Sequence, residues 1–301
     1  MSLISLQFAL FIVVSVCAYY GVGRVFGRGQ WVVLLLASMA FYALAASWQL
    51  FALVLAVAGI TWGCSLGMSA IDARSREARK AAESREERKA VKARFASRKR
   101  LVLIAGLLGS VAILGYFKYW NTILNYLRLE PSTTSLGILL PLGISFYTFQ
   151  ALGYLIDVYN ATIEPERNFA KYLLFVSWFP QVIQGPINRF SELSGQLLAT
   201  RGASGERLER AFLRFGYGCL KKIVIANTVG GTVAATLNSA TPQIPGSVAL
   251  VGIMAYAIQM YADFSGGIDM VEGVSELFGV ELAQNFRQPY FSVSLADYWR
   301  R

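Results

Sequence analysis

The sequence predicts an all-α, polytopic integral membrane protein with multiple transmembrane helices and one re-entrant segment. Three observations support this fold class. Hydrophobic residues make up 55% of the 301 residues and charged residues only 15%, whereas soluble domains carry roughly 25% charged residues. Most apolar residues fall in long runs, and an apolar run of about 18 to 20 residues can cross a bilayer as a helix. One further apolar run is short and contains prolines. This composition excludes disordered proteins, small disulfide scaffolds and most water-soluble enzymes.

Eight apolar runs are expected to be embedded in the membrane. The first, residues 3–20, is interpreted as a retained span rather than a signal peptide, because no Lys or Arg precedes it and no small-residue cleavage site follows it. The remaining runs, in chain order, are residues 31–46, 50–68, 101–119, 136–159, 172–187, 211–237 and 247–262. No repeat or linker separates them, so residues 1–301 are expected to form a single transmembrane domain.

The charge distribution predicts the orientation. Residues 72–100 contain 12 Lys and Arg against 5 Asp and Glu, and the positive-inside rule places such a loop in the cytoplasm. Arg24 and Arg28, two spans earlier, are placed on the same side. The N-terminus is therefore expected outside the inner (plasma) membrane of the cell, which the chain crosses several times.

Residues 72–100 are rich in Ala, Glu, Lys and Arg. This composition favours a solvated cytoplasmic helix whose charges set the topology and contact anionic lipid. Nucleic acid is a less suitable partner, because Phe95 is the only aromatic residue there and the interleaved acidic residues weaken the positive field.

The whole sequence contains no histidine, so no imidazole among these 301 residues can act as a base or bind a metal. Its three cysteines, Cys17, Cys64 and Cys219, lie in apolar runs and are interpreted as buried free thiols. We therefore expect no metal site.

Polar residues and helix breakers enter two apolar stretches in the second half of the chain. Residues 141–160 carry Gln150, and residues 175–190 carry prolines, glutamines and a glycine in a run too short to span comfortably. Such a segment is tolerated in a membrane where it is buried in protein or lines a wet cavity, which favours a re-entrant segment. The alternative is a kinked helix whose glutamines hydrogen-bond to neighbouring helices. The helix breakers and glutamines of this segment are Pro180, Gln181, Gln184, Gly185 and Pro186.

Residues 255–279 combine ionisable residues with a predicted helix break. Asp263 and Asp269 flank the Ser-Gly-Gly sequence at 265–267, next to the apolar run 247–262. An ionisable side chain at membrane depth is costly and usually functional. The alternative is that Asp263 caps a helix at the membrane boundary, which needs no chemistry. The sequence alone supports the two interpretations equally.

Five stretches in the second half of the chain form a recognisable set, namely PLGISFYTFQALGYLIDVY (141–159), FPQVIQGPINRF (179–190), GCLKKIVIAN (218–227), YAIQMYADFSGGIDMVEGVSELFGVEL (256–282) and NFRQPYFSVSLADYWRR (285–301). They resemble the membrane-bound O-acyltransferase family, in the branch of the alginate O-acetylation protein and the teichoic acid D-alanyl-transfer protein. They occur in the family's order and cover most of residues 136–301, whereas residues 1–135 match only in hydropathy and layout. The family has Tyr-Ser at 267–268 and often Asn at 288, and both departures are expected to be tolerated.

The resemblance implies transfer of an acyl group, in the first place acetyl, from a thioester to a hydroxyl group. The implied donor is acetyl-CoA or an acyl carrier protein in the cytoplasm. The implied acceptor is an extracytoplasmic polysaccharide or another polymer of the cell envelope. Membrane lipid and an extracytoplasmic acyltransferase are further expected partners, and no covalently bound cofactor is implied. In the family a buried histidine is the general base that takes the proton of the attacking hydroxyl.

The resemblance also assigns candidate site residues. In the family the Trp-Arg-Arg sequence continues into Trp-His, so the general base is expected after Arg301 and these 301 residues alone are expected to be inactive. Lys221 and Lys222 are candidates for contact with donor phosphates, with topology and lipid contact as the favoured alternative. Arg300 and Arg301 are expected to pair with carboxylates. The candidates for the cavity wall and its supports are Gln150, Pro180, Gln181, Gly185, Pro186, Gln259, Asp263, Ser265, Asn285, Arg287, Asp297, Trp299, Arg300 and Arg301.

Two other functions are open at this point. A secondary transporter would use a discontinuous helix such as the one expected near Asp263, but it would need a matching broken helix that residues 1–135 do not offer. A non-catalytic membrane subunit or an inert remnant would share the family sequence without the base. The five stretches favour the acyltransferase over the transporter, but they do not separate the enzyme from an inert relative.

Overall fold

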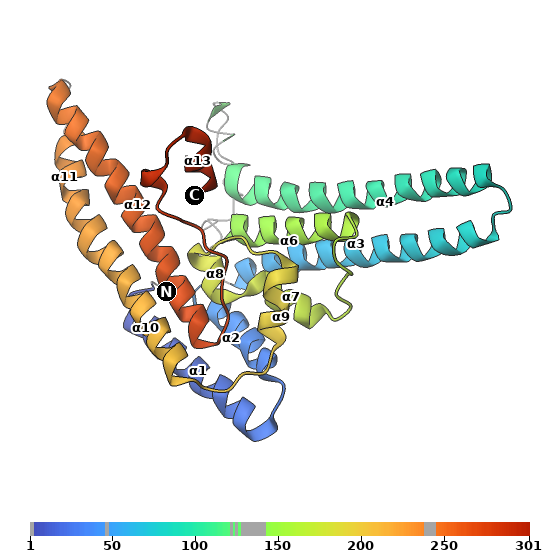
Figure 1. Ribbon diagram of the computed structural model, residues 1–301, viewed down its shortest axis with the longest axis horizontal. Coiled ribbons are helices and arrows are strands. Elements are labelled where there is room, and N and C mark those ends of the chain that lie inside the picture. The colour runs from blue at the N-terminus through green and yellow to red at the C-terminus, as the bar shows by residue number, and fades with distance from the viewer. Residues whose placement is uncertain (1–2, 46–47, 121–122, 124–125, 128–142, 238–244) are drawn as a thin grey trace. The chain divides into compact units, whose positions relative to one another are not determined.

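The computed structural model of the protein describes residues 3–45, 48–120, 123, 126–127, 143–237 and 245–301. Throughout these residues every regular element is a helix (Figure 1), which confirms the all-α prediction. Of the helices described, four are long and apolar enough to cross a membrane, namely Leu6–Phe26, Phe51–Ala81, Arg85–Tyr119 and Gly246–Leu277.

The elements follow one another in the order α1 to α13, with the π-helices η1 and η2 and the 3-10 helix η3 between them. Their bounds are α1 (Leu6–Phe26), α2 (Gln30–Ala45), α3 (Trp48–Ala81), α4 (Arg85–Leu114), η1 (Gly115–Tyr119), α6 (Ile144–Tyr159), α7 (Phe169–Ser177), α8 (Phe179–Gln184), α9 (Phe190–Leu198), α10 (Gly205–Cys219), η2 (Leu220–Ala226), α11 (Asn227–Leu237), α12 (Gly246–Leu277), η3 (Pro289–Phe291) and α13 (Leu295–Arg300). The first part of the predicted run 136–159 lies outside the described residues, and the rest of it forms α6.

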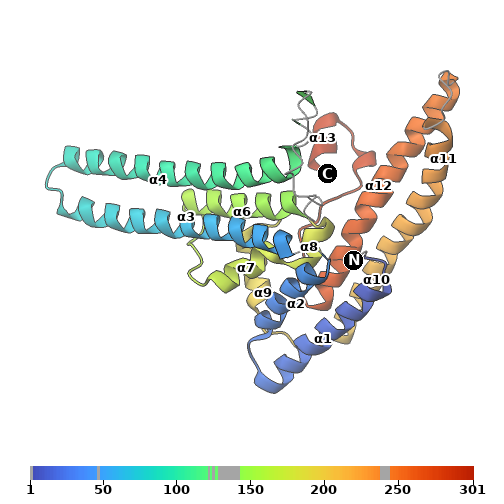
Figure 2. The same cartoon turned by 180° about the vertical axis from the view of Figure 1, so that it is seen from behind.

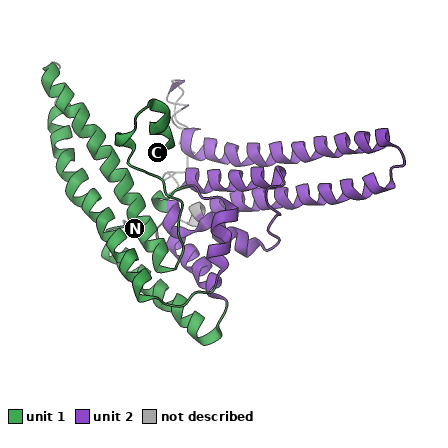
Figure 3. Ribbon diagram, viewed as in Figure 1, with its two compact units in different colours: residues 1–28, 183–186, 200–301 green, residues 29–182, 187–199 purple. Residues whose placement is uncertain are grey.

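The chain divides into two compact units (Figure 3). Unit 1 holds residues 1–28, 183–186 and 200–301, and unit 2 holds residues 29–182 and 187–199. Unit 1 therefore contains α1 and the elements from α10 onward. The expectation of a single domain over residues 1–301 stays a prediction.

A long helical hairpin forms one part of unit 2. α3 and α4 run side by side in both views (Figures 1 and 2) and carry residues 72–100 at their connected ends. Lys99 donates to the Asp72 carboxylate at 2.6 Å and joins the two helices. At the turn, Ser84 Oγ accepts from the Glu87 N–H at 3.1 Å, while the Glu87 carboxylate accepts from the Ser84 N–H at 3.3 Å. This capping box starts α4, so residues 72–100 are helical on both sides of a short turn.

The short run that was predicted to be re-entrant, residues 172–187, falls mostly in unit 2, whereas its residues 183–186 belong to unit 1. The run forms two short helices, α7 and α8, which meet at Trp178. Pro180 explains the break, because proline has no N–H to donate and its ring clashes with the carbonyl one turn earlier. Gln181 Nε2 donates to Gln150 Oε1 at 2.6 Å, and Gln150 Nε2 donates to the Phe175 carbonyl at 2.8 Å. Neither helix is long enough to cross a bilayer. The glutamines hydrogen-bond to neighbouring elements, which is the feature expected of a kinked helix.

Unit 1 is built on a long pair of helices. α10, η2 and α11 continue into one another and pack along α12 (Figure 1). The backbones of α10 and α12 approach each other closely where Gly218 faces Gly266. A Cβ on Gly218 would lie only 2.5 Å from the Gly266 carbonyl oxygen. Small residues allow helix backbones to approach closely in a membrane, where dispersion replaces the hydrophobic effect as the attraction between helices.

The helix break predicted at residues 265–267 does not occur, because α12 is continuous from Gly246 to Leu277. The glycines serve packing instead. Gly266 faces Gly218, and the Gln184 side chain covers Gly267 so closely that a Cβ there would collide with its amide. A glycine inside a helix costs about 1 kcal/mol relative to alanine, which close packing of this kind can offset. The discontinuous helix that motivated the transporter alternative is therefore absent from α12.

Replacing Gly218 by alanine is expected to destabilise the protein, because the new Cβ would meet the Gly266 backbone. Overpacking of this kind typically costs about 1–3 kcal/mol. Gly216, on the same helix, is the matched control: its Cβ would meet no atom of the described chain within 4 Å outside its own helix. Gly216→Ala should be neutral or slightly stabilising, since alanine favours helices. Thermal unfolding in detergent, followed by circular dichroism, compares the two variants, and equal melting temperatures would contradict the close packing.

Candidate functional site

Charged side chains of unit 1 form a ladder of ion pairs between α12 and the segment α10–η2. Lys222 pairs with Asp263, and Lys221 Nζ lies 2.6 Å from an oxygen of Asp269. Arg214 of α10 completes the ladder with three acidic partners. A charged side chain at membrane depth requires a partner, and these contacts supply one for each acid of α12. The charge ladder consists of Arg214, Lys221, Lys222, Asp263, Asp269, Glu272 and Glu276.

Arg214 is the most connected member of the charge ladder. Its Nη1 lies 2.9 Å from Glu276, its Nε lies 3.9 Å from Asp269, and its Nη2 pairs with Glu272. The Glu272 side chain is only 3% exposed. A guanidinium group presents five N–H donors in a planar fork, which lets one cation serve several carboxylates at once.

The π-helix η2 places both lysines of the charge ladder. Neighbouring residues of a regular α-helix point about 100° apart, yet Lys221 and Lys222 both reach carboxylates of α12. The wider winding of a π-helix changes these directions, and π-helical turns often mark functional sites. Lys221 Nζ also lies 4.4 Å from the centre of the Tyr217 ring, a cation–π contact that adds to its ion pair.

A cavity of about 550 Å³ lies beside the middle of α12 and is called the α12 cavity. Its wall includes the predicted residues Asp263, Asn285, Trp299 and Arg301. The cavity therefore brings together predicted residues that are up to 38 positions apart in the sequence, from Asp263 to Arg301. The other lining residues are Met260, Tyr261, Phe264, Phe286, Pro289, Tyr290 and Tyr298.

Aromatic contacts hold the segment after α12 against that helix. The Tyr261 ring contacts Phe286 and Tyr290, with ring centres 5.8 and 5.2 Å apart, and Phe264 contacts Phe286 at 5.6 Å. Tyr290 donates its hydroxyl to the Ala257 carbonyl at 2.8 Å.

The short helix α13 folds back on the segment that precedes it. Arg301 Nε donates to the Asp297 carboxylate at 2.9 Å. The Arg287 N–H donates to the Arg301 carbonyl at 2.8 Å, and Ser294 Oγ caps α13 by accepting from the Asp297 N–H at 3.1 Å. Arg301 thus makes the carboxylate pair expected of it. These contacts hold the Trp299 end of α13 at the α12 cavity.

Other candidates of unit 1 lie outside the α12 cavity. Gln259 packs against Gly230 of α11. Ser265 is buried, and its hydroxyl makes no hydrogen bond with the residues that the structure describes. Gly185 and Pro186 are buried. Arg300 is exposed, and the described residues offer it no ion pair.

Three candidates belong to unit 2, namely Gln150, Pro180 and Gln181. The structure gives them a defined local role, since the two glutamines bind each other in the core and Pro180 ends α7. Their assignment to the wall of a substrate cavity stays a prediction.

The cysteines are free but less buried than predicted: Cys17 is exposed, and Cys64 and Cys219 are half-buried. Cys17 lies on a face of α1 that other described helices cover only in part. Within the described residues, no group of three or more His, Cys, Asp or Glu side chains is placed to hold a metal ion.

Sequence reasoning missed three members of the charge ladder, Arg214, Glu272 and Glu276. Asp269, Glu272 and Glu276 are spaced by three and four residues, which puts them on one face of a helix. Arg214 precedes Lys221 by seven residues, or about two helical turns. Both spacings were signals in the sequence, but they become meaningful only once α10 and α12 are known to be neighbours.

Replacing Lys221 by methionine is expected to destabilise unit 1, because Asp269 would keep only its 3.9 Å contact with Arg214. Removing one partner of a buried ion pair costs about 3–5 kcal/mol, and the Lys221 and Asp269 side chains are 14% and 18% exposed. Lys222→Met is the matched comparison and should cost less, because the Asp263 carboxylate lines the α12 cavity and its side chain is 50% exposed, so the loss of its partner leaves a less deeply buried charge. Thermal unfolding measures the stability of both variants. Equal losses of stability would show that the two ion pairs do not differ in strength according to their burial.

Acid is expected to loosen α13 through Asp297. The hydrogen bond from Arg301, with a second from the Val293 N–H, lowers the pKa of Asp297. A lowered pKa contributes stability that is complete above the ordinary Asp pKa of about 3.9 and is lost as the pH falls through the lowered value. Trp299 fluorescence should therefore stay constant from pH 7 to about 4 and change only below that. Asp297→Asn should abolish this transition, and an unchanged acid transition in the variant would assign it to another group.

Comparison with known proteins gives the chain its relatives, although no protein-family model matches it. The chain is 32% identical to "Probable alginate O-acetylase AlgI" of Pseudomonas aeruginosa, over 97% of this chain and 52% of that protein. It is 33% identical to a peptidoglycan O-acetyltransferase of Helicobacter pylori, over 67% of this chain and 44% of that protein. It is 28% identical to a teichoic acid D-alanyltransferase of Streptococcus thermophilus, over 58% of this chain and 43% of that protein.

The chain spans about half the length of the curated relatives it matches. Their names agree with the branch that the five sequence stretches indicated. On these matches, the chain belongs to the membrane-bound O-acyltransferase family.

Proposed function

We propose that this chain takes part in moving an acyl group, in the first place acetyl, from a cytoplasmic thioester to a hydroxyl group of an extracytoplasmic polysaccharide or other envelope polymer. One observation carries the proposal. All the residues that line the α12 cavity fall within the stretches 256–282 and 285–301, which carry the resemblance to the acyltransferases. The α12 cavity is therefore our candidate chamber for acyl transfer.

The position of the α12 cavity along α12 suits such a reaction. α12 has 32 residues, which corresponds to about 48 Å at 1.5 Å per residue and is more than the thickness of a bilayer core. Asp263 is the eighteenth of them, close to the middle. A donor that approaches from one face of the membrane and an acceptor that approaches from the other could meet at this depth.

The transfer itself needs a base. In the proposed step the acceptor hydroxyl loses its proton to a neutral histidine, its oxygen forms a bond to the thioester carbonyl carbon, and the thiol leaves with its sulfur reprotonated. The resemblance implies that a Trp-His pair directly follows the Trp-Arg-Arg sequence, and we assign the base to this histidine. Trp299 and Arg301 line the α12 cavity, so a base supplied next to them would act in the same chamber.

We assign Asp263 a positioning and electrostatic role. Its carboxylate lies on the wall of the α12 cavity, is 50% exposed and is held by Lys222. A fixed negative charge there would stabilise the imidazolium that forms when a histidine takes the hydroxyl proton. Lys221 and Lys222 already pair with carboxylates, so we propose that they position Asp263 and Asp269 and do not bind the phosphates of the donor.

Asp263→Asn should lower kcat/KM for acyl transfer by about tenfold, or about 1.4 kcal/mol, with most of the loss in kcat. The test uses the full-length protein as its gene encodes it, in lipid vesicles, with radiolabelled acetyl-CoA or an acetylated carrier protein and the envelope polysaccharide of the source cell. Asp72→Asn is the control, because Asp72 pairs with Lys99 in the α3–α4 hairpin.

A folded Asp263→Asn protein with wild-type activity would remove Asp263 from the proposal. The same assay tests the function itself. Absence of acyl transfer by the full-length protein with either thioester would favour the non-catalytic subunit. The 301-residue chain alone should show no transfer, because it contains no histidine, and turnover by that chain would overturn the assignment of the base.

A further inference from the structure

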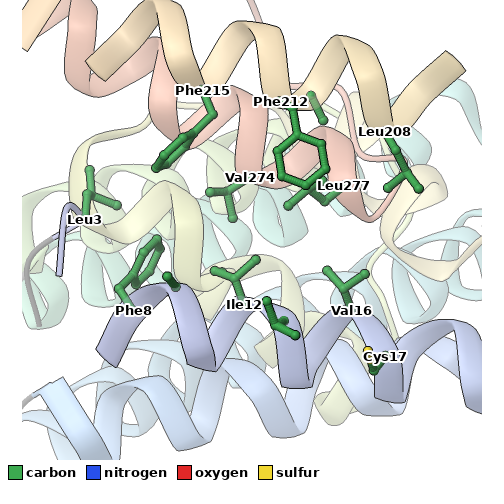
Figure 4. A pocket seen from close by; sticks show the side chains of 13 residues that line it. Leu3, Phe8, Ile12, Val16, Cys17, Leu208, Phe212, Phe215, Val274 and Leu277 are labelled. Atoms are coloured by element: carbon green, nitrogen blue, oxygen red, sulfur yellow. The ribbon is translucent and has the colours of Figure 1, made fainter. Parts of the chain in front are cut away.

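A second cavity of unit 1 lies among α1, α10 and α12, and its volume is about 320 Å³. We call it the α1 pocket. Figure 4 shows Leu3 and Phe8 at one end and Cys17 and Leu208 at the other, with side chains from both walls pointing into the space between. It shares no lining residue with the α12 cavity.

The chemistry of the α1 pocket excludes water and polar ligands from its interior. Its lining consists of carbon side chains and the thiol of Cys17. A buried water needs two to four polar partners, and an apolar cavity without them stays dry or takes up an apolar guest. α1 and α12 are both long and apolar enough to cross a membrane, so the acyl chains of lipids are the apolar molecules at hand.

The shape of the α1 pocket suits one acyl chain. Along α1 its lining runs from Phe8 to Cys17, which is about 14 Å at 1.5 Å per residue. Its volume is near the lower end of the range of about 300 to 1,000 Å³ for ligand sites. Such a pocket is long and narrow, and it would hold one chain rather than a bulky ring system.

Two arginines mark one end of the α1 pocket. Leu208 of the lining directly follows Arg207 in the sequence, and Leu277 of the lining lies two residues before Gly279. A Cβ on Gly279 would lie 2.5 Å from Cδ of Arg201 and 3.0 Å from Nη1 of Arg207, so the two arginine side chains meet at this glycine. Gly279 has φ of +75°, a left-handed conformation that only glycine adopts without strain.

The same end is fixed in place by contacts with α1. The Tyr20 hydroxyl donates to the Leu277 carbonyl at 2.7 Å, and the Tyr19 ring contacts Phe278 with ring centres 5.5 Å apart. Arg24, in the last turn of α1, adds positive charge beyond Tyr20. An apolar pocket thus leads to a cluster of guanidinium groups, which bind phosphate in a planar, bidentate manner.

We propose that the α1 pocket binds an anionic phospholipid, with one acyl chain between α1 and α10 and the phosphate group against Arg201 and Arg207. The apolar lining selects the chain, and the arginines select the negative headgroup. Anionic lipids gather in the cytoplasmic leaflet, where the positive-inside rule also places Arg24. This inference does not depend on acyl transfer and concerns a site apart from the α12 cavity.

The test uses the full-length protein, purified in mild detergent, and native mass spectrometry to count bound phospholipids. Phosphatidylglycerol and phosphatidylcholine are offered in equal amounts. We expect about one phosphatidylglycerol to stay bound to the wild-type protein. Val16→Trp fills the α1 pocket, to which Val16 contributes, and should lower occupancy at least tenfold. Val14→Trp is the matched control on the same helix, since Val14 is 67% exposed and outside the lining.

A second variant separates the headgroup from the acyl chain. Arg207→Gln should remove the preference for phosphatidylglycerol over phosphatidylcholine while some lipid stays bound, and its fold is checked by thermal unfolding. Inorganic phosphate at millimolar concentration should not displace the lipid, because it has no acyl chain. If inorganic phosphate displaced the lipid, the arginines would form a site for free phosphate, and the proposal of a phospholipid site would be wrong.

A wild-type protein without bound phospholipid would overturn the proposal and indicate that another helix of the protein, or a second copy, fills the α1 pocket. Retention of the lipid by Val16→Trp at the level of Val14→Trp would also overturn it, because the lipid would then lie elsewhere on the surface.

Discussion

The pairing of charges on α12 is the constraint on which the rest of unit 1 depends. Four acidic residues on a helix long enough to cross a membrane would be prohibitive without partners, and Arg214, Lys221 and Lys222 supply them. Because each pair joins α12 to the segment α10–η2, the charge ladder sets the register of the two helices against each other. The glycine contact between Gly218 and Gly266 lets the two helix backbones approach closely between the pairs of the charge ladder.

The cavities of unit 1 follow from this pairing. α10 and η2 hold one face of α12, and the segment 285–291 packs beside its middle turns, where the aromatic residues of that segment line the α12 cavity together with Asp263 of the charge ladder. The α1 pocket forms on a different side, where α1 meets the apolar residues of α10 and α12. The single helix α12 therefore contributes to the charge ladder, to the α12 cavity and to the α1 pocket.

Much of this could be predicted from the sequence, since hydropathy, charge runs and family motifs are local signals. The helical class, the helical character of residues 72–100 (though not the turn between α3 and α4 within them) and the residues Asp263, Asn285, Trp299 and Arg301 of the α12 cavity belong to this group. The partners of Asp263 and Asp269 do not, because which helices are neighbours depends on tertiary packing. The break expected at residues 265–267 failed for a related reason: a glycine that permits close approach and a glycine that ends a helix look the same in one sequence.

The α3–α4 hairpin has a consequence for how far the protein reaches from the membrane. Both helices continue without a break from their apolar parts into the charged part, so the hairpin must follow the direction of the spans. Residues 85–100 of α4 precede the apolar run and cover about 24 Å at 1.5 Å per residue, whereas the Debye length at physiological ionic strength is about 8 Å. Only the basic residues nearest the bilayer can interact electrostatically with lipid headgroups. The charges at the tip of the hairpin lie beyond the screening length and act on solutes in the aqueous phase.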